Sequence, residues 1–476
     1  MTTVPLSLLQ SLEGLKGFQR EAFEQVHADG KDLSSVRYNP LKWPLETLPD
    51  LYPENVTEPV VQTAIPWSSR GYYVSPRPSF TLDPLFHAGA YYVQEASSMF
   101  LEQALAQHAS LDQPLRALDL CAAPGGKSTL LQSLLSPESV LVSNEVIKSR
   151  SSILEENLTK WGALNTIVTN NDPRDIARLQ DFFDLIVVDA PCSGSGLFRR
   201  DPTAIEEWSE SAVTLCSQRQ QRILSDILPA LKEDGLLIYS TCSYSKQEDE
   251  DILDWLVAEH GLESLSIKLD ASWGIEEVVS TEQQSYGYRF WPHLLKGEGF
   301  FIACFRKKNA SGSSIRTPKN ARLEKATKAE VAAVQHWLQP DAGGAFMKLG
   351  EALNYIPEGM ERDLMYISSC NLYLRKAGVL IGKWTGRELL PDHALSMSSL
   401  VSEDHVAISL NREQALQYLR REEVILDPMP ELSKHPFKGW SLVRYGGLPL
   451  GWIKLLSNRI NNYYPKEWRI LKKAGS

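Results

Sequence analysis

Residues 117–131 read ALDLCAAPGGKSTLL, and this stretch decides the fold of the chain. An apolar run at 117–120 leads directly into a glycine-rich turn at 121–127, and a helical pattern begins at Ser128. Glycines let the backbone approach a ligand, and the N–H groups of a helix N-terminus point toward it. The stretch predicts a strand, a turn and a helix start that hold a nucleotide-type cofactor. A plain tight turn explains the same residues equally well, because neither the dinucleotide-binding pattern nor the P-loop pattern of glycines is present.

Apolar runs and helical patterns alternate on both sides of this turn. We expect strands at Arg116–Leu120, Val140–Asn144, Thr166–Asn170, Leu185–Asp189, Leu236–Ser240 and Phe300–Phe305. We expect helices at Ser128–Leu135, Arg150–Trp161, Ser211–Lys232 and Glu248–His260. This alternation predicts an α/β fold with a mostly parallel sheet. The direction of the last strand stays open, because no clear crossover helix precedes it.

The rest of the chain divides around this α/β region, which spans 96–308. Residues 1–95 combine a helical pattern, Leu6 to His27, with short apolar runs split by prolines, which indicates a small α+β domain. We interpret 309–377 as a linker and intermediate region. Residues 378–476 contain many short strand-like runs and are expected to form a β-rich domain.

Composition and charge limit the classes of function. The net charge of −10 argues against a protein that coats nucleic acid nonspecifically, although Lys and Arg predominate over acids in 306–328 and 454–473. We find no run of 18 apolar residues and no secretory signal in the sequence, so no membrane span is expected and we place the protein in the cytoplasm. The six cysteines form no C-x-x-C pair, which favours reduced thiols over a disulfide scaffold or a zinc site. We therefore expect no metal.

Two cysteines follow other strands of the predicted sheet. Cys192 comes three residues after Asp189, which ends one strand, and Cys242 follows the strand that ends at Ser240. Ligands of open α/β sheets bind outside the carboxyl ends of the strands, so we expect both thiols beside the glycine-rich turn. Both lie in polar turns, where a thiol can be exposed and reactive. The alternative is a buried structural thiol, which we assign to Cys216, Cys304 and Cys370.

Two acids follow the strands on the other side of the turn. Glu145 comes about 20 residues after the turn, where an acid can accept hydrogen bonds from ribose hydroxyls, and Asp172 is placed to accept one from an adenine amino group. Each acid could equally be a helix cap or a loop residue. Together, at successive strand ends, they favour an adenosyl cofactor.

This set of groups is suited to methylation of a pyrimidine carbon. Carbon 5 of cytosine is a poor nucleophile, but a thiolate that adds to carbon 6 turns the ring into an enamine, which reacts with the methyl group of S-adenosylmethionine. An acid must hydrogen-bond the ring during the attack, a base must remove the carbon-5 proton, and the thiol must then leave. Cys242, Cys192 and Asp189 supply suitable groups.

Several motifs resemble those of the RNA cytosine-5 methyltransferases of the Nol/Nop/Sun type, over roughly 36–307. They are Tyr92–Met99, Cys121–Lys127, Asp189–Gly194, Ser240–Ser243 and Gly297–Phe301. The resemblance implies that 96–308 form a Rossmann-like, S-adenosylmethionine-dependent methyltransferase core.

The same resemblance implies roles for single residues. Cys242 would be the attacking nucleophile, and Cys192 would assist release of the methylated product. Asp189 would contact the cytosine, and Lys127 would contact the cofactor or Asp189. The residues implied to bind S-adenosylmethionine are Cys121, Ala122, Ala123, Pro124, Gly125, Gly126, Lys127, Glu145, Asp172, Asp189 and Pro191.

Candidates for RNA contacts lie on both sides of the core. Residues 36–42 are similar to the N-terminal R-x-N motif of the family, which implies an RNA-binding cap at 1–95 with Arg37 and Asn39 as contacts. Arg200 lies in a segment similar to the R-x-D-P segment of the family. A structural salt bridge is the alternative for either arginine.

The domain at 378–476 is similar to the PUA-type RNA-binding extension of the RsmF-type bacterial enzymes. The residues there that suit phosphate contacts and base stacking are Lys454, Arg459, Tyr464, Lys466 and Arg469. An amphipathic final helix with a solvated basic face is the alternative.

The expected activity is S-adenosylmethionine-dependent methylation of cytosine carbon 5 in small-subunit (16S) ribosomal RNA by a monomer, because the RsmF-type enzymes act on that RNA. Transfer RNA is the alternative substrate. An RNA-binding ribosome assembly factor with a vestigial site is the alternative from another class. The intact set of Cys242, Cys192, Asp189 and Lys127 argues against it.

Overall fold

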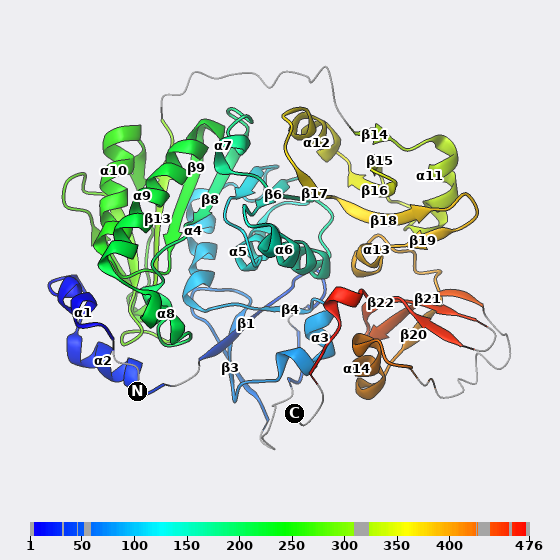
Figure 1. The fold of residues 1–476 in the computed structure, drawn as a ribbon, viewed down its shortest axis with the longest axis horizontal. Helices are drawn as coiled ribbons and strands as arrows, with labels where there is room; N and C mark the ends of the chain where they lie inside the picture. Colours follow the sequence, from blue (N-terminus) through cyan, green and yellow to red (C-terminus); the bar gives the residue numbers. More distant parts are fainter. Residues whose placement is uncertain are drawn as a thin grey trace.

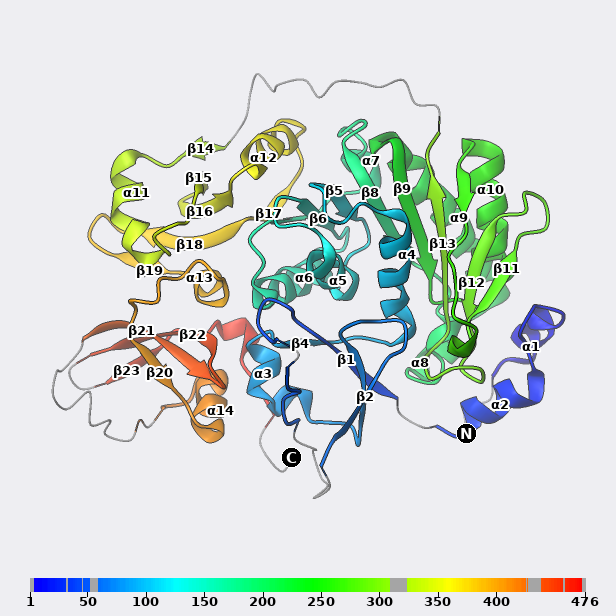
Figure 2. The same cartoon turned by 180° about the vertical axis from the view of Figure 1, so that it is seen from behind.

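A long mixed sheet runs through the middle of the molecule and carries helices on both faces (Figures 1 and 2). The structure is a computed structural model that describes residues 4–30, 33–44, 46–51, 59–308, 323–424, 426, 438–456 and 459–472. The strands lie in the order β11 (Glu276–Val279), β12 (Tyr286–Phe290), β13 (Phe300–Arg306), β9 (Leu231–Thr241), β8 (Phe183–Asp189), β5 (Arg116–Asp119), β6 (Val140–Asn144), β7 (Thr166–Thr169) and β17 (Leu374–Ala377), and β10 (Glu263–Leu265) pairs with β13.

Strands β5 to β9 are all parallel, so the predicted α/β fold is confirmed. Strand β13 runs antiparallel to β9, which settles the direction that the sequence left open. The helices of this region are α4 (Leu101–His108), α5 (Gly126–Leu134), α6 (Lys148–Trp161), α7 (Pro173–Ile176), α8 (Thr203–Glu207), α9 (Glu210–Ile227) and α10 (Glu250–His260).

Alternate residues of the central strands point into two separate cores. In β8, Ile186 and Val188 pack on one face, and Leu185 and Val187 pack on the other. A strand that is covered on both faces is apolar throughout, which is why these strands appear in the sequence as continuous apolar runs. The predicted helix Ser211–Lys232 is too long, because α9 ends at Ile227 and β9 already begins at Leu231.

The N-terminal region consists of two parts. Its sheet has the order β2 (Val61–Ala64), β3 (Gly71–Ser75), β1 (Ser34–Tyr38) and β4 (Tyr91–Val93), with α3 (Pro84–His87) before β4. The helical pattern at its start forms two helices, α1 (Leu6–Leu12) and α2 (Arg20–Ala28), because Gly14 and Gly17 between them have positive φ angles.

The helix pair α1 and α2 packs against the α/β region. Leu8 and Phe23 share an apolar cluster with Phe198, Tyr244 and Trp291. The pair therefore supports a loop of the α/β region, and Figure 1 shows it beside α8.

The described part of the linker and intermediate region, 323–377, is folded. These residues form β14 (Glu324–Lys325), α11 (Lys328–Val334), β15 (Gly344–Leu349), β16 (Ala352–Pro357), α12 (Met360–Ser369) and β17. Strand β16 pairs with β18 (Val379–Trp384), which pairs with β19 (Leu389–Pro391), whereas β17 pairs with β7 of the central sheet. A boundary at 377/378 therefore separates two consecutive strands and cuts a sheet. Residues 309–322 lie outside the described residues.

The C-terminal region is a small sheet flanked by two helices. Its elements are α13 (His393–Met397), β20 (Ala407–Ser409), α14 (Arg412–Arg420), β21 (Gly439–Tyr445), β22 (Leu448–Leu455) and β23 (Ile460–Asn462). After β23 the described chain forms only a short 3₁₀ turn at Lys466–Trp468, so the alternative of an amphipathic final helix is wrong.

Candidate active site

The carboxyl ends of three neighbouring strands meet at the candidate site. Strand β5 leads into the glycine-rich turn, β8 leads into the loop with Cys192, and β9 leads into the loop with Cys242. The three strands are adjacent and parallel, in the order β9, β8, β5. The two thiols and the glycine-rich turn are therefore brought together, as the sequence predicts.

The turn depends on one glycine with a left-handed conformation. Gly125 has a φ of 116° and directly precedes α5. An added Cβ there would contact Leu154 and Asn157 at 3.4 and 3.5 Å, and the backbone conformation itself is one that residues with a side chain rarely adopt. Gly125 thus lets the chain turn from the strand into α5 with the first N–H groups of that helix turned to the site.

Asp189 is held by one partner from α5 and one from β9. The Nζ atom of Lys127 lies 2.7 Å from Oδ2 of Asp189, and the hydroxyl of Ser240 donates to Oδ1 at 2.8 Å. Lys127 also lies over the ring of Phe300, 5.2 Å from its centroid. Both carboxylate oxygens are engaged, so the orientation of this acid is fixed.

The two thiols are direct neighbours. The sulfur atoms of Cys192 and Cys242 lie 2.9 Å apart, and both residues are only partly buried. The hydrogen bond to Cys242, burial and nearby negative charge raise the pKa of Cys192 well above its usual range. At neutral pH Cys192 is therefore a thiol that can share its proton with the neighbouring sulfur.

A backbone clamp holds the Cys242 loop. The N–H of Gly196 donates to the carbonyl of Cys242 at 2.8 Å, and the N–H of Gly299 donates to the carbonyl of Gly196 at 3.1 Å. A Cβ on Gly196 would collide with the carbonyls of Gly299 and Cys242. A Cβ on Gly299 would in turn lie 2.5 Å from the Cα of Gly196, which explains the second glycine of the motif at 297–301.

The acids after β6 and β7 lie at the same edge of the sheet. Glu145 is 3% exposed, and its Oε1 accepts from the N–H of Ile147 at 2.9 Å. Asp172 accepts from the N–H of Arg174 at 3.1 Å and caps α7, so the capping role that the sequence left open is present. The exposed carboxylate of Asp172 can accept further hydrogen bonds, so its capping role does not prevent it from binding a ligand.

Asp119 is a site residue that the sequence analysis missed. It ends β5, is fully buried, and accepts from the hydroxyl of Ser128 at 2.7 Å, while its Oδ1 has no hydrogen-bond partner among the described residues. Burial raises its pKa to about 7. The signal was available, because Asp119 is an acid at a strand end, like Glu145 and Asp189.

The structure corrects the assignment of Arg37 and Asn39 as RNA contacts. Arg37 is 2% exposed and donates to Gln94 at 2.9 Å, to Ser133 at 3.0 Å and to Thr129 at 2.6 Å. These bonds brace α5, which carries the cofactor turn. The amide of Asn39, fully buried, donates to the carbonyls of two neighbouring segments, Gly89 at 2.9 Å and Trp161 at 2.8 Å.

The other candidates for RNA contacts differ in how accessible their side chains are. Arg200, Arg459, Lys466 and Arg469 are exposed. The Nζ atom of Lys454 is bound to both carboxylate oxygens of Glu388, at 3.0 and 2.9 Å. Tyr464 is fully buried, so its assignment as a base-stacking residue is wrong.

The described ranges contain neither a metal-binding cluster nor a membrane-spanning helix. No cluster of three or more His, Cys, Asp or Glu side chains there could hold a metal ion. No helix there is long and apolar enough to cross a membrane.

The sequence of this chain matches known protein families and known proteins. Three family models match successive parts of the chain: the N-terminal domain of 16S rRNA methyltransferase RsmF over 4–96, 16S rRNA methyltransferase RsmB/F over 108–306, and the methyltransferase RsmF PUA domain over 405–470. Ribosomal RNA small subunit methyltransferase F of Shewanella oneidensis is 31% identical over 457 residues, which cover 91% of this chain and 90% of the relative. The chain belongs to the RsmB/F family of 16S rRNA methyltransferases.

One further relative and a solved structure agree with this assignment. The Shewanella loihica enzyme of the same name is 30% identical over 417 residues, 85% of this chain and 83% of the relative. The crystal structure of PH0851 superposes with a TM-score of 0.54 at 25% identity and covers 64% of this chain and 66% of its own. The predicted Rossmann-like methyltransferase core with an N-terminal and a PUA-type domain is confirmed, and this RsmB/F member is an RNA methyltransferase of an S-adenosylmethionine-dependent family.

Proposed function

We propose that this RsmB/F member transfers the methyl group of S-adenosylmethionine to carbon 5 of a cytosine in 16S ribosomal RNA, through a covalent bond between Cys242 and carbon 6. The observation that carries the proposal is the pair of thiols 2.9 Å apart, beside an acid whose two oxygens are held by Lys127 and Ser240. The names of the RsmF relatives favour ribosomal RNA as the substrate.

The residues at the strand ends fit the cofactor. S-adenosylmethionine supplies a methyl group on a positively charged sulfur when it is bound. The unpartnered Oδ1 of Asp119 is a buried acceptor at this edge, and the turn before α5 presents backbone N–H groups. Glu145, Asp172, Asp189 and Pro191 complete the set of residues that we assign to cofactor binding.

The two thiols have separate tasks in the proposed reaction. The Cys242 thiolate forms a bond to carbon 6, which makes carbon 5 the nucleophile for methyl transfer, while Asp189 hydrogen-bonds the ring. When the carbon-5 proton leaves to a base, the ring double bond re-forms and the bond from carbon 6 to Cys242 breaks. We assign Cys192 to this release step, because its sulfur is the neighbour of the sulfur that departs.

The target base must leave its stack to reach the thiols, and exposed basic residues are suited to hold the surrounding RNA. We propose Arg200, Arg459 and Lys466 for phosphate contacts. We further propose that the protein acts as a monomer in the cytoplasm, where thiols stay reduced.

Bisulfite sequencing of total RNA tests the proposal, in cells that lack the gene and in the same cells that express the wild type or Cys242→Ala. Loss of one 5-methylcytosine from 16S ribosomal RNA, restored only by the wild type, is the expected result. Loss confined to transfer RNA would support the proposed reaction but contradict 16S ribosomal RNA as its substrate. No change in either RNA would overturn the proposed function.

A further inference from the structure

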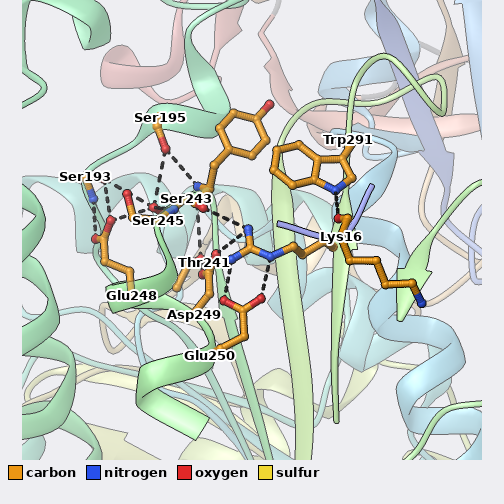
Figure 3. A network of polar contacts seen from close by, with 12 residues as sticks. Lys16, Ser193, Ser195, Thr241, Ser243, Ser245, Glu248, Asp249, Glu250 and Trp291 are labelled. Atoms are coloured by element: carbon orange, nitrogen blue, oxygen red, sulfur yellow. Dashed lines mark hydrogen bonds and ion pairs between the residues drawn. The ribbon is translucent and has the colours of Figure 1, made fainter. Parts of the chain in front are cut away.

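A single carboxylate joins the two loops that carry the catalytic thiols (Figure 3). Glu248 is fully buried at the end of a short 3₁₀ turn, Lys246–Glu248, just before α10. Its Oε1 accepts from the N–H of Ser193 at 2.8 Å, and its Oε2 accepts from the hydroxyls of Ser193 at 2.5 Å and Ser243 at 2.6 Å. Ser193 follows Cys192 in the chain, and Ser243 follows Cys242.

The bridge sets the distance between loops that come from different strands. The Cys192 loop follows β8 and the Cys242 loop follows β9, and each is bound to Glu248 through the residue next to its cysteine. The Glu248 carboxylate is itself anchored to a helix, because Gln220 of α9 donates to Oε1 at 3.2 Å. Loss of the Glu248 carboxylate would therefore remove the link that fixes one thiol loop relative to the other.

The bonding pattern indicates that Glu248 is ionised. All four hydrogen bonds are donated to the carboxylate, by one backbone N–H, two hydroxyls and one amide, which is the arrangement that an anion needs. Burial raises the pKa of Glu248, and the bonds from Ser193, Ser243 and Gln220 oppose that rise.

Glu248 differs from the two acids that follow it, because those two form ion pairs with an arginine. The guanidinium of Arg289 pairs with the next two acids in the chain, Asp249 at 3.2 Å and Glu250 at 2.5 Å. Among the described residues, Glu248 has no such ion pair with a lysine or arginine. Its negative charge therefore acts on the titratable groups that face it, which are Cys192, Cys216, Tyr239 and Asp249.

We propose that Glu248 is a positioning residue of the methyl transfer: it holds the two thiol loops in register, and its negative charge opposes ionisation of the neighbouring Cys192. This inference rests on the proposed covalent mechanism. Glu248 acts through the cysteines and does not itself touch the substrate.

Two substitutions of Glu248 distinguish the effect of its hydrogen bonds from the effect of its negative charge. Glu248→Gln keeps the size of the side chain and can still bond both serines, whose hydroxyls then accept from the amide, but it removes the charge. Glu248→Ala removes the bridge and the charge. Asp251→Asn is the matched control, because Asp251 lies in the first turn of α10 in an exposed ion pair with Lys246.

The first readout is alkylation of each cysteine by iodoacetamide across pH, followed by mass spectrometry on the full chain without RNA. In Glu248→Gln we expect the alkylation profile of Cys192 to move to lower pH by about one unit, because loss of a nearby negative charge stabilises its thiolate. Asp251→Asn is expected to follow the wild type. A Cys192 profile in Glu248→Gln that coincides with the wild type would overturn the role of the charge.

The second readout is the split between kcat and KM for methyl transfer to RNA. We expect kcat to fall about tenfold in Glu248→Gln and about a hundredfold in Glu248→Ala, with KM for RNA within about twofold of wild type, since the loss concerns the transition state and not substrate binding. Unchanged kcat in both variants would overturn the inference. If Glu248→Ala does not fold, Glu248→Gln decides alone. A wild type that is inactive on cytosine would instead overturn the proposed function, which keeps the two failures distinct.

Discussion

Lys127 Nζ lies 2.7 Å from Asp189 Oδ2, and this contact joins the glycine-rich turn to the loop that carries Cys192. The lysine side chain is only 12% exposed, whereas the side chain of Asp189 is 37% exposed and remains open to a ligand. Because Ser240 on β9 donates to the other oxygen of Asp189, the ends of β5, β8 and β9 are coupled through one carboxylate. A change at any of the three is therefore expected to alter the orientation of Asp189.

Lys127→Met tests this coupling. We expect kcat to fall at least tenfold, because the substitution removes the cation that orients Asp189 and leaves that carboxylate with one partner. Steady-state methyl transfer with radiolabelled cofactor measures the effect. Lys268→Met, an exposed lysine outside the site, is the control that should keep wild-type kcat. Equal activity of the two variants would show that the ion pair is dispensable.

Cys242→Ala is expected to abolish methyl transfer while cofactor binding stays within about twofold of wild type, because the thiol bonds the cytosine and not the cofactor. Activity assays together with calorimetric titration of S-adenosylmethionine provide both readouts. Cys370→Ala removes another partly exposed cysteine and is expected to remain active. Substantial methylation by Cys242→Ala would rule out this residue as the nucleophile.

Cys192→Ala is expected to accumulate a covalent complex with RNA, because the first thiol can still attack and the release step is slowed. A slow-migrating band in a denaturing gel, lost after nuclease treatment, would identify the complex. The double variant Cys192→Ala/Cys242→Ala should give no such band. Rapid turnover by Cys192→Ala without any band would contradict the release role.

The affinity for S-adenosylmethionine is expected to rise between pH 6 and pH 8. Burial raises the pKa of Asp119 to about 7, so this carboxyl is mostly neutral below pH 7 and negative above it. The cofactor carries positive charge, so it binds the ionised form more tightly, by up to about tenfold across this range. Calorimetry at several pH values measures the trend, and Asp119→Asn should flatten it. A pH dependence that persists in Asp119→Asn would assign it to another group.

Arg37→Met is expected to destabilise the fold by roughly 2–4 kcal/mol, because the substitution leaves buried acceptors on Gln94, Thr129 and Ser133 without their donor. Urea unfolding followed by circular dichroism measures the change. The paired variant Arg200→Met removes an exposed arginine, and we expect it to keep wild-type stability while it weakens RNA binding. The opposite pattern would restore Arg37 as the RNA contact.

The sequence predicted the central strands and the positions of the thiols because those features are local. Apolar runs such as 185–188 mark strands that are buried on both faces, and the residue after each run necessarily lies at the carboxyl edge. The order of the strands then brings Cys192 and Cys242 together without further information.

The misassigned residues depend on partners far away in the chain. Arg37 looks like a surface residue by type, but its partners Thr129 and Ser133 come from a helix about 90 residues downstream. Glu248 is one of several acids in a row, and only the meeting of two loops singles it out. The strand at 374–377 carries two basic residues and no alternating apolar pattern, so its sequence does not indicate that it pairs with the central sheet.

Strand β17 comes from outside the stretch that matches the methyltransferase family model, yet it completes the edge of the central sheet beside β7. The carbonyl of Tyr373, just before β17, accepts from the N–H of Asn170, two residues from Asp172. A protein cut after residue 308 would expose the hydrogen-bonding groups of β7 to self-association and would loosen the segment that leads to Asp172. The stretch that the family model covers is therefore smaller than the unit that folds, and the folding unit is the one that an engineer must keep.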